Sequence, residues 1–375
     1  MPEPSFSIGI EEEYMLVDPA SGALARNVPR ALMPAMKRRL GKAVSSEFLQ
    51  SQVEIGTRPC KSVAAARREL MRLRATVAEV AAHHDLAIIA ASTHPFAEAE
   101  GQQITKRARY AALANDLQAV VRRLLISGMH VHVGIDDDEL RVDLMNQASY
   151  ILPHLLALST SSPFWRGADT GLKSYRLSVW DEMPRTGLPY PFETYSDYRR
   201  HVDTLVGAGV IEDATKVWWD LRISARYPTL EMRISDLCTN VHDAACVAAL
   251  FQCWLRMLYR LRLSNQRWRQ YSNWLLEENR WRACRYGIDS GLIDFGRGLI
   301  IEYPTLLNEI LGLIAQDAEA LGCVGEVKHA RAIVRRGTSA HRQLRVYHKA
   351  LARGDSETGA LIKVVNWLRK ETLRA

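Results

Sequence analysis

Polar residues, most of them acidic or basic, recur at alternate positions in four short stretches of the sequence. Glu11 and Glu13 flank Glu12. Because successive side chains of a strand point to opposite faces, Glu11 and Glu13 share one face and Glu12 points to the other. The same spacing relates three further pairs: Gln52 and Glu54, His130 and His132, and Glu231 and Arg233. Each of four predicted strands therefore carries a polar pair on one side.

Polar groups at alternate strand positions ordinarily mark the solvated face of an antiparallel sheet. Here, however, nearly all of them are glutamate or histidine, which are side chains that bind metals. Carboxylates that face one another repel, and their pKa values rise, unless cations lie between them. The pattern predicts a divalent-metal site, and its excess of carboxylates over imidazoles favours Mg²⁺ or Mn²⁺ over zinc.

Two of these features allow other interpretations. The pair His130 and His132 alone fits a zinc-hydrolase fragment, a core pair, or a magnesium ligand beside a substrate-binding neighbour, and the glutamates favour the last. Arg233 shares a face with Glu231, so it suits either a phosphate or a salt bridge to that glutamate. Neither a Walker lysine loop nor a GxGxxG motif is present. Nucleotide phosphates would therefore be held by metal ions and arginines.

Hydrophobic periodicity predicts the elements that position these residues. Period-2 alternation over 6–16 ends at a turn-like segment, 18–22, and extended patterning returns at 47–57, 86–92, 128–135 and 217–236. Helical patterning covers 62–82, 105–125, 139–160, 197–207 and nearly everything from about 241 onward, while 163–195 is loop-rich and suggests a functional lid. We interpret the chain as an α+β body with one catalytic domain over 1–375, comprising a sheet-containing core at 1–240 and a mainly helical part at 241–375.

Composition restricts the class of partner. The 375 residues include 49 Lys and Arg against 42 Asp and Glu, a net charge of +7 that permits anionic substrates without requiring nucleic acid. Arginines and aromatics interleave over 254–282, but their helical spacing favours packed aromatics with arginines that are solvated or bridge to another subunit. No signal-peptide pattern or long apolar run is evident. We expect a cytoplasmic protein with small-molecule substrates, no nucleic acid or membrane partner, and a homodimer as one option.

Six motifs in sequence order carry a family resemblance. The motifs are GIEEEY at 9–14, QVEI at 52–55, GMHVHVG at 128–134, WWDLR at 218–222, TLEMRISD at 229–236 and GTSA at 337–340, and ENRWRACRYG at 278–287 is similar to a late helical motif. Together they resemble the carboxylate–amine ligase family, the YbdK-like type-2 glutamate–cysteine ligases of the glutamine-synthetase-like superfamily.

The resemblance implies a curved, mostly antiparallel sheet with a metal site on its concave face, backed by helices. It implies an ATP-dependent ligase that makes an amide through an acyl phosphate, with glutamate as the acyl donor and cysteine or another amine as the acceptor. ATP and two or more Mg²⁺ or Mn²⁺ ions would be needed. Alternatives are a guanidino-type phosphotransferase on the same fold and a non-catalytic nucleotide- or metal-binding relative.

The resemblance also implies residue roles. Glu11, His130 and Glu231 would hold the metal that bridges to the γ-phosphate, and Glu13 and Glu54 would hold a second metal. Arg233 would stabilise the transferring phosphoryl group, and His132 would lie toward the acyl substrate. Four further arginines resemble positions that bind phosphate or substrate carboxylate: Arg176, Arg222, Arg285 and Arg342. His341 stands where the family pattern leads us to expect aspartate.

Overall fold

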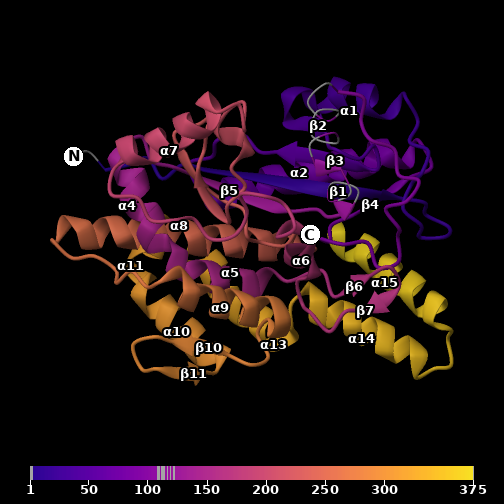
Figure 1. The fold of residues 1–375 in the computed structure, drawn as a ribbon. Helices are drawn as coiled ribbons and strands as arrows, with labels where there is room; N and C mark the ends of the chain where they lie inside the picture. Colours follow the sequence, from indigo (N-terminus) through magenta and orange to yellow (C-terminus); the bar gives the residue numbers. More distant parts are fainter. Residues whose placement is uncertain are drawn as a thin grey trace.

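The computed structural model describes residues 3–107, 110, 115, 117, 118, 120 and 123–374. A seven-stranded sheet crosses the molecule, with helices packed beside and below it in the view of Figure 1. Its strands are β1 (Ile8–Val17), β2 (Val44–Ser46), β3 (Gln52–Gly56), β4 (Ala87–Ile89), β5 (Met129–Gly134), β8 (Leu221–Ile223) and β9 (Thr229–Met232). The order is β2-β3-β1-β5-β9-β8, with β4 pairing the end of β1, and each pair is antiparallel.

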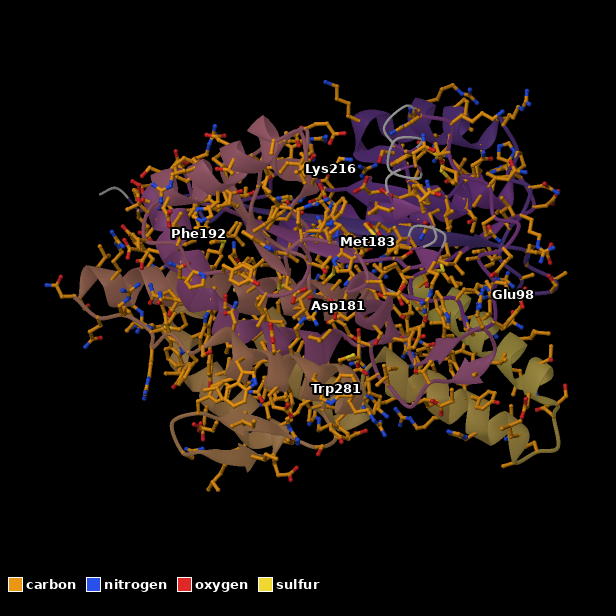
Figure 2. All side chains as sticks on the ribbon, in the orientation of Figure 1. Glu98, Asp181, Met183, Phe192, Lys216 and Trp281 are labelled. Atoms are coloured by element: carbon orange, nitrogen blue, oxygen red, sulfur yellow. The ribbon has the colours of Figure 1, made fainter. Side chains whose placement is uncertain are left out.

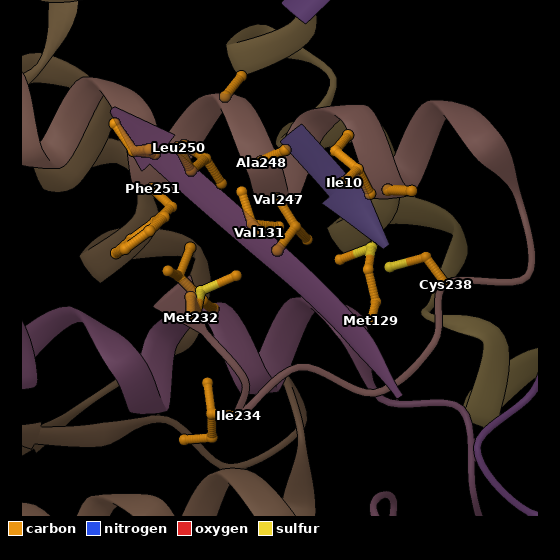
Figure 3. Packing of buried hydrophobic residues seen from close by; sticks show 14 of the residues in the cluster. Ile10, Met129, Val131, Met232, Ile234, Cys238, Val247, Ala248, Leu250 and Phe251 are labelled. Atoms are coloured by element: carbon orange, nitrogen blue, oxygen red, sulfur yellow. The ribbon is translucent and has the colours of Figure 1, made fainter. Parts of the chain in front are cut away.

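Long helices cover the apolar face of this sheet. The principal ones are α2 (Val63–Ala82) and α8 (Val241–Leu263), which contact each other and β1. Figure 3 shows Ile10 of β1 and Val131 of β5 against Val247 and Phe251 of α8. Residues Ile8 and Ile10 alternate with Glu11 and Glu13 along β1, so burying the apolar set presents the carboxylates on the other face.

The remaining helices fill the lower part of the molecule and its edges. They are α1 (Leu32–Leu40), α4 (Asp138–Ala148), α5 (Leu152–Ser159), α6 (Tyr175–Trp180), α7 (Tyr195–Gly207), α9 (Asn273–Tyr286), α10 (Tyr303–Leu313), α11 (Ala315–Ala320), α12 (Val324–Lys328), α13 (Ala330–Arg336), α14 (Ser339–Leu351) and α15 (Glu357–Thr372). Short 3₁₀ turns occupy Gly41–Ala43, Ser149–Ile151 and Ala214–Lys216.

Most expected elements are present, with four differences. The expected strand at 47–57 is shorter, because 47–51 connect β2 to β3 and the strand begins at Gln52. The loop-rich region contains α6 and a small hairpin, β6 (Phe164–Trp165) with β7 (Ala168–Asp169). The helical part contains an unexpected hairpin, β10 (Leu292–Asp294) with β11 (Leu299–Ile301). The helix expected at 105–125 falls mostly outside the described residues.

One described helix, α8, is long and apolar enough to cross a membrane by length and composition alone. However, 83% of its apolar window is buried inside the protein. That burial is typical of the central helix of a soluble protein, where both sides of the helix contact other elements.

Candidate active site

The strand register brings the predicted polar pairs side by side on one face of the sheet. Glu13 lies opposite Glu54 across β1 and β3, and Glu11 lies opposite His130 across β1 and β5. On the other side of β5, His132 lies opposite Glu231. The alternation of side chains within each strand determines which residues share a face. The antiparallel register then determines which residues lie opposite one another on neighbouring strands.

These side chains line one cavity of about 450 Å³. Nine of the predicted site residues take part: Glu11, Glu13, Glu54, His130, His132, Arg176, Arg222, Glu231 and Arg233. The wall also includes Met183 and Lys216, which are labelled near the centre of Figure 2. The sequence therefore identified most of the charged lining of the cavity.

Carboxylates gather at one side of the cavity. Two groups of three side chains, Glu11 with Glu54 and His130, and Glu13 with Glu47 and Glu54, have ligand atoms that all lie within 4.8 Å of one another. Burial, together with the charges of Glu11 and Glu13, raises the pKa of Glu54 to about 7. Burial and the charges of Glu13 and Glu54 raise the pKa of Glu47 as well. A divalent cation would relieve this repulsion, so the donor set fits Mg²⁺ or Mn²⁺.

Glu47 was missed by sequence reasoning. Strict alternation through a continuous strand would place Glu47 on the opposite face from Gln52 and Glu54. The chain instead turns between β2 and β3, and this turn brings Glu47 to the same cavity. Within the sequence, only a break in the strand periodicity at 47–51 could have indicated this turn.

Glu11 is held by two histidines. His130 Nδ1 lies 3.3 Å and His132 Nε2 lies 3.6 Å from the same oxygen of Glu11, Oε2. Burial would raise the pKa of Glu11, but its contacts with His130 and then His132 outweigh burial and hold that pKa well below its usual range. Burial and then the charge of Arg233 lower the pKa of His130. His130 therefore favours the neutral form that binds metals.

Arginines gather at the other side of the cavity around Glu231. Arg222 donates to both oxygens of Glu231 at 2.9 Å, and Arg233 also pairs with this carboxylate. Burial would raise the pKa of Glu231, but Arg233 and Arg222 hold it well below its usual range. Glu231 is in neither group of candidate ligands. We expected Glu231 to bind a metal together with Glu11 and His130. In this structure the arginines instead occupy both oxygens of Glu231.

Arg176 reaches the cavity from α6 and is almost completely buried. Its Nη2 donates to the carbonyl of Arg233 at 3.2 Å, and its Nε has no partner in the part of the chain that the structure describes. A Cβ on Gly128 would lie only 2.7 Å from Arg176 Nη2. Glycine at 128 therefore leaves room for the guanidinium, and its backbone N–H donates to Glu13 at 2.7 Å.

Two predicted arginines lie outside the cavity. Arg285 donates to the carbonyl of Gly171, and Arg342 pairs with Glu371. Their expected contacts with phosphate or substrate are therefore not supported by position, because α9 and α14 direct these side chains elsewhere. His341 is also outside the cavity, and its Nε2 lies 2.9 Å from Asp289.

Known protein sequences are similar to nearly the whole of this chain. A family model described as "Glutamate-cysteine ligase family 2" matches residues 7–366. A protein of Rhodospirillum rubrum named "Putative glutamate--cysteine ligase 2" is 58% identical over 377 residues, which covers 100% of this chain and 97% of that protein. A protein of Jannaschia sp. with the same name is 53% identical over 98% of this chain and 96% of its own length.

Two solved structures share the fold. A bifunctional glutathione synthetase from Pasteurella multocida matches with a TM-score of 0.70 and 17% identity over 98% of this chain, which corresponds to 52% of that protein. A glutamate–cysteine ligase from Francisella tularensis, solved in complex with AMP, matches with a TM-score of 0.68 and 14% identity over 98% of this chain and 89% of its own. These matches confirm the expected α+β fold, which this chain shares with both proteins.

Proposed function

The chain belongs to glutamate-cysteine ligase family 2, and we propose that its cavity activates a carboxylate with ATP for attack by an amine. As a member of that family it is an ATP-dependent ligase that forms C–N bonds. One observation carries the assignment of the site: a single cavity combines partly buried carboxylates on β1 and β3 with arginines on α6, on β8 and directly after β9. Phosphoryl transfer needs this combination, because cations must offset charge that spreads over the phosphoryl oxygens.

We assign two divalent cations, Mg²⁺ or Mn²⁺, to the carboxylate side. Glu11, Glu54 and His130 would hold one, and Glu13, Glu47 and Glu54 the other, with Glu54 shared. When bound, these ions supply positive charge to the phosphate oxygens of ATP. The raised pKa of Glu54, about 7, agrees with a carboxylate placed to share cations.

The arginines act on the opposite side of the transferring group. Arg233 and Arg176 each keep a buried Nε without a partner among the described residues. Such donors are available to phosphoryl oxygens at no cost in reorganisation during the reaction. His132 lies between Glu11 and Glu231, at 3.6 Å and 4.0 Å, where it would orient the acyl substrate.

A second hollow of about 240 Å³ shares Glu11, His132 and Tyr227 with the cavity. Gly9 and Gly134 form part of its floor, and Tyr227 and Pro228 form part of its wall. Gly9 places no side chain on this face of the sheet, whereas the hydroxyls of Ser5 and Ser7 occupy the space beside Gly134. This mostly apolar hollow beside the candidate cation ligands suits the base of ATP.

The proposed substrates are glutamate and cysteine or another small amine, and we propose that the protein acts in the cytoplasm. ADP release over a matrix of carboxylates and amines, with mass spectrometry of the products, tests this function. We expect an amide product. ADP with a phosphorylated guanidino compound and no amide would instead indicate a phosphotransferase.

The proposed intermediate has its own test. Carboxylate attack on the γ-phosphorus forms an acyl phosphate and releases ADP, and the amine then displaces phosphate. Hydroxylamine in place of the amine should give a hydroxamate, and one ¹⁸O atom from a labelled carboxylate should appear in the released phosphate. An amide formed without label in the phosphate would contradict this route.

A further inference from the structure

Arg280, in α9, lies outside the cavity but contacts two segments that form its wall. Its Nη1 and Nη2 each donate to Asp181 at 2.7 Å, and its Nε donates to Asp220 at 2.6 Å. The side chain of Arg280 is 12% exposed and that of Asp220 is 1% exposed. In Figure 2, Asp181 lies between Met183 of the cavity wall and Trp281 of α9. One largely buried guanidinium therefore joins α9 to both segments.

The contact with Asp220 leads directly to the cavity arginines. The carbonyl of Asp220 accepts the backbone N–H of Arg233 at 2.8 Å and that of Ile234 at 3.1 Å. The carbonyls of the same two residues accept from Arg176 at 3.2 Å and 3.4 Å. A displacement of Asp220 would therefore move the backbone that carries Arg233 and holds Arg176.

The contact with Asp181 leads to the same arginines by a second route. Asp181 directly follows Trp180, the last residue of α6. The guanidinium carbons of Arg176 and Arg233 lie 5.7 Å and 5.8 Å from the centre of the Trp180 ring. Trp180 also donates to the carbonyl of Trp218 at 3.3 Å. The ring is thus a common platform for both cations.

We propose that Arg280 is a positioning residue that sets the placement of Arg176 and Arg233 for phosphoryl transfer. The inference rests on the proposed function, in which those two arginines face the transferring group. Arg280 does not contact the substrate; it acts through Asp220 and Asp181. A planar guanidinium donates in several fixed directions and so bridges two carboxylates, whereas a lysine ammonium is a single point charge.

The test compares Arg280→Lys and Asp181→Asn with a matched control, Arg256→Lys. Arg256 donates to the fully buried Asp317 at 2.9 Å, and neither residue lines the cavity. For Arg280→Lys we expect turnover to fall roughly 10- to 100-fold, because small misplacements of reacting groups have costs of that order. Asp181→Asn removes the charge and one of the two acceptor oxygens from one of the two contacts, so its loss of turnover should be smaller. It also keeps the test informative if Arg280→Lys does not fold.

Three measurements decide the outcome: turnover, the melting temperature, and the crystal structure of each variant. Support requires that turnover falls more than in Arg256→Lys at a similar melting temperature, and that the Arg233 guanidinium moves from the Trp180 ring. Unchanged turnover, or an equal loss in Arg256→Lys, would overturn the inference. If the wild type forms no amide, the proposed function fails. In that case the crystal structures alone test the role of Arg280. If Arg233 has the same position in the Arg280→Lys structure as in the wild type, Arg280 does not position it.

Discussion

Glu54 is the residue whose behaviour depends most on its neighbours. Glu13 faces it across the strand pair, Glu11 and Glu47 approach it from either side, and Ser45 donates to it at 2.5 Å. Its pKa of about 7 reflects burial together with the charges of Glu11 and Glu13. Near neutral pH a bound cation must therefore displace a proton from part of the population, so we expect cation affinity to increase with pH through this range.

Glu47→Gln tests the ligand that the sequence did not reveal. Mn²⁺ affinity should weaken by at least about 10- to 100-fold, the range seen when only an outer-shell partner is lost. The melting temperature should change little, because the substitution keeps the side-chain volume. Titration with Mn²⁺, followed by electron paramagnetic resonance of the free ion, measures the effect. Glu79→Gln on the surface is the control, and a Glu47→Gln protein that binds Mn²⁺ like the wild type would remove Glu47 from the ligands.

Arg233→Lys should lower turnover more than ATP affinity. The substitution keeps the charge but loses the planar fork, and loss of one aligned donor to a transition state costs roughly 10²-fold in turnover. Single-turnover assays with calorimetric ATP binding separate the two effects, and Arg267→Lys on the surface serves as control. If ATP affinity fell and turnover held, Arg233 would belong to ground-state binding.

At the scale of elements, β1 positions the site through the buried side chain of Glu12 as well as through Glu11 and Glu13, which face the cavity. Glu12 points away from the cavity and forms a fully buried pair with Arg74 of α2, whose Nε donates at 2.8 Å. Arg74 also donates to the carbonyls of Cys238 and Thr239 at 2.9 Å and 2.6 Å. The pair thus ties β1 to α2 and to the segment after β9, and so helps hold Glu11 and Glu13 outward.

Arg74→Met should destabilise the protein by roughly 3–5 kcal/mol, because it leaves the carboxylate of Glu12 buried without its partner. Adding Glu12→Gln should recover part of the loss by removing that charge. Urea unfolding measures both. Arg39→Met breaks an exposed pair with Glu79 and should change stability little. An equally small effect of Arg74→Met would show that the buried pair does not anchor β1.

At the scale of the whole molecule, acid sensitivity depends on buried histidines. His154 lies among aromatic rings, with Tyr150 at 5.4 Å between ring centres, and neither ring nitrogen has a partner among the described residues. Burial lowers its pKa to about 4. The unfolded chain therefore binds a proton at higher pH than the folded one, so the contribution of His154 is intact above about pH 6.5 and declines as pH falls toward 4.

His154→Phe isolates this effect from Glu54 and Glu47, whose raised pKa values act in the opposite direction. Between pH 6.5 and pH 5, the stability of the variant should rise relative to the wild type by about 1.5 kcal/mol. Unfolding in urea at several pH values gives this difference whatever the absolute cost of the substitution. A difference that stays constant with pH would mean that His154 does not resist protonation.

The sequence alone determined which strand faces carry the chemistry. Alternation is a local property of extended backbone, so the pairing of Glu11 with Glu13 and of His130 with His132 could be read without knowing the fold. The apolar residues that alternate with these side chains point to the opposite face of the sheet, so only that opposite face can be buried in the core. The family resemblance then indicated the reaction and the sheet, and the comparisons confirm both.

Only the tertiary structure decided which residues meet. The turn at 47–51 brought Glu47 to the carboxylates, the strand register paired Glu231 with Arg222, and helices α9 and α14 directed Arg285 and Arg342 away from the cavity. The contacts of Arg280 join Asp181 and Asp220 from separate parts of the chain. Such contacts depend on turns and helix packing between distant segments, and the period of a single strand or helix carries no information about them.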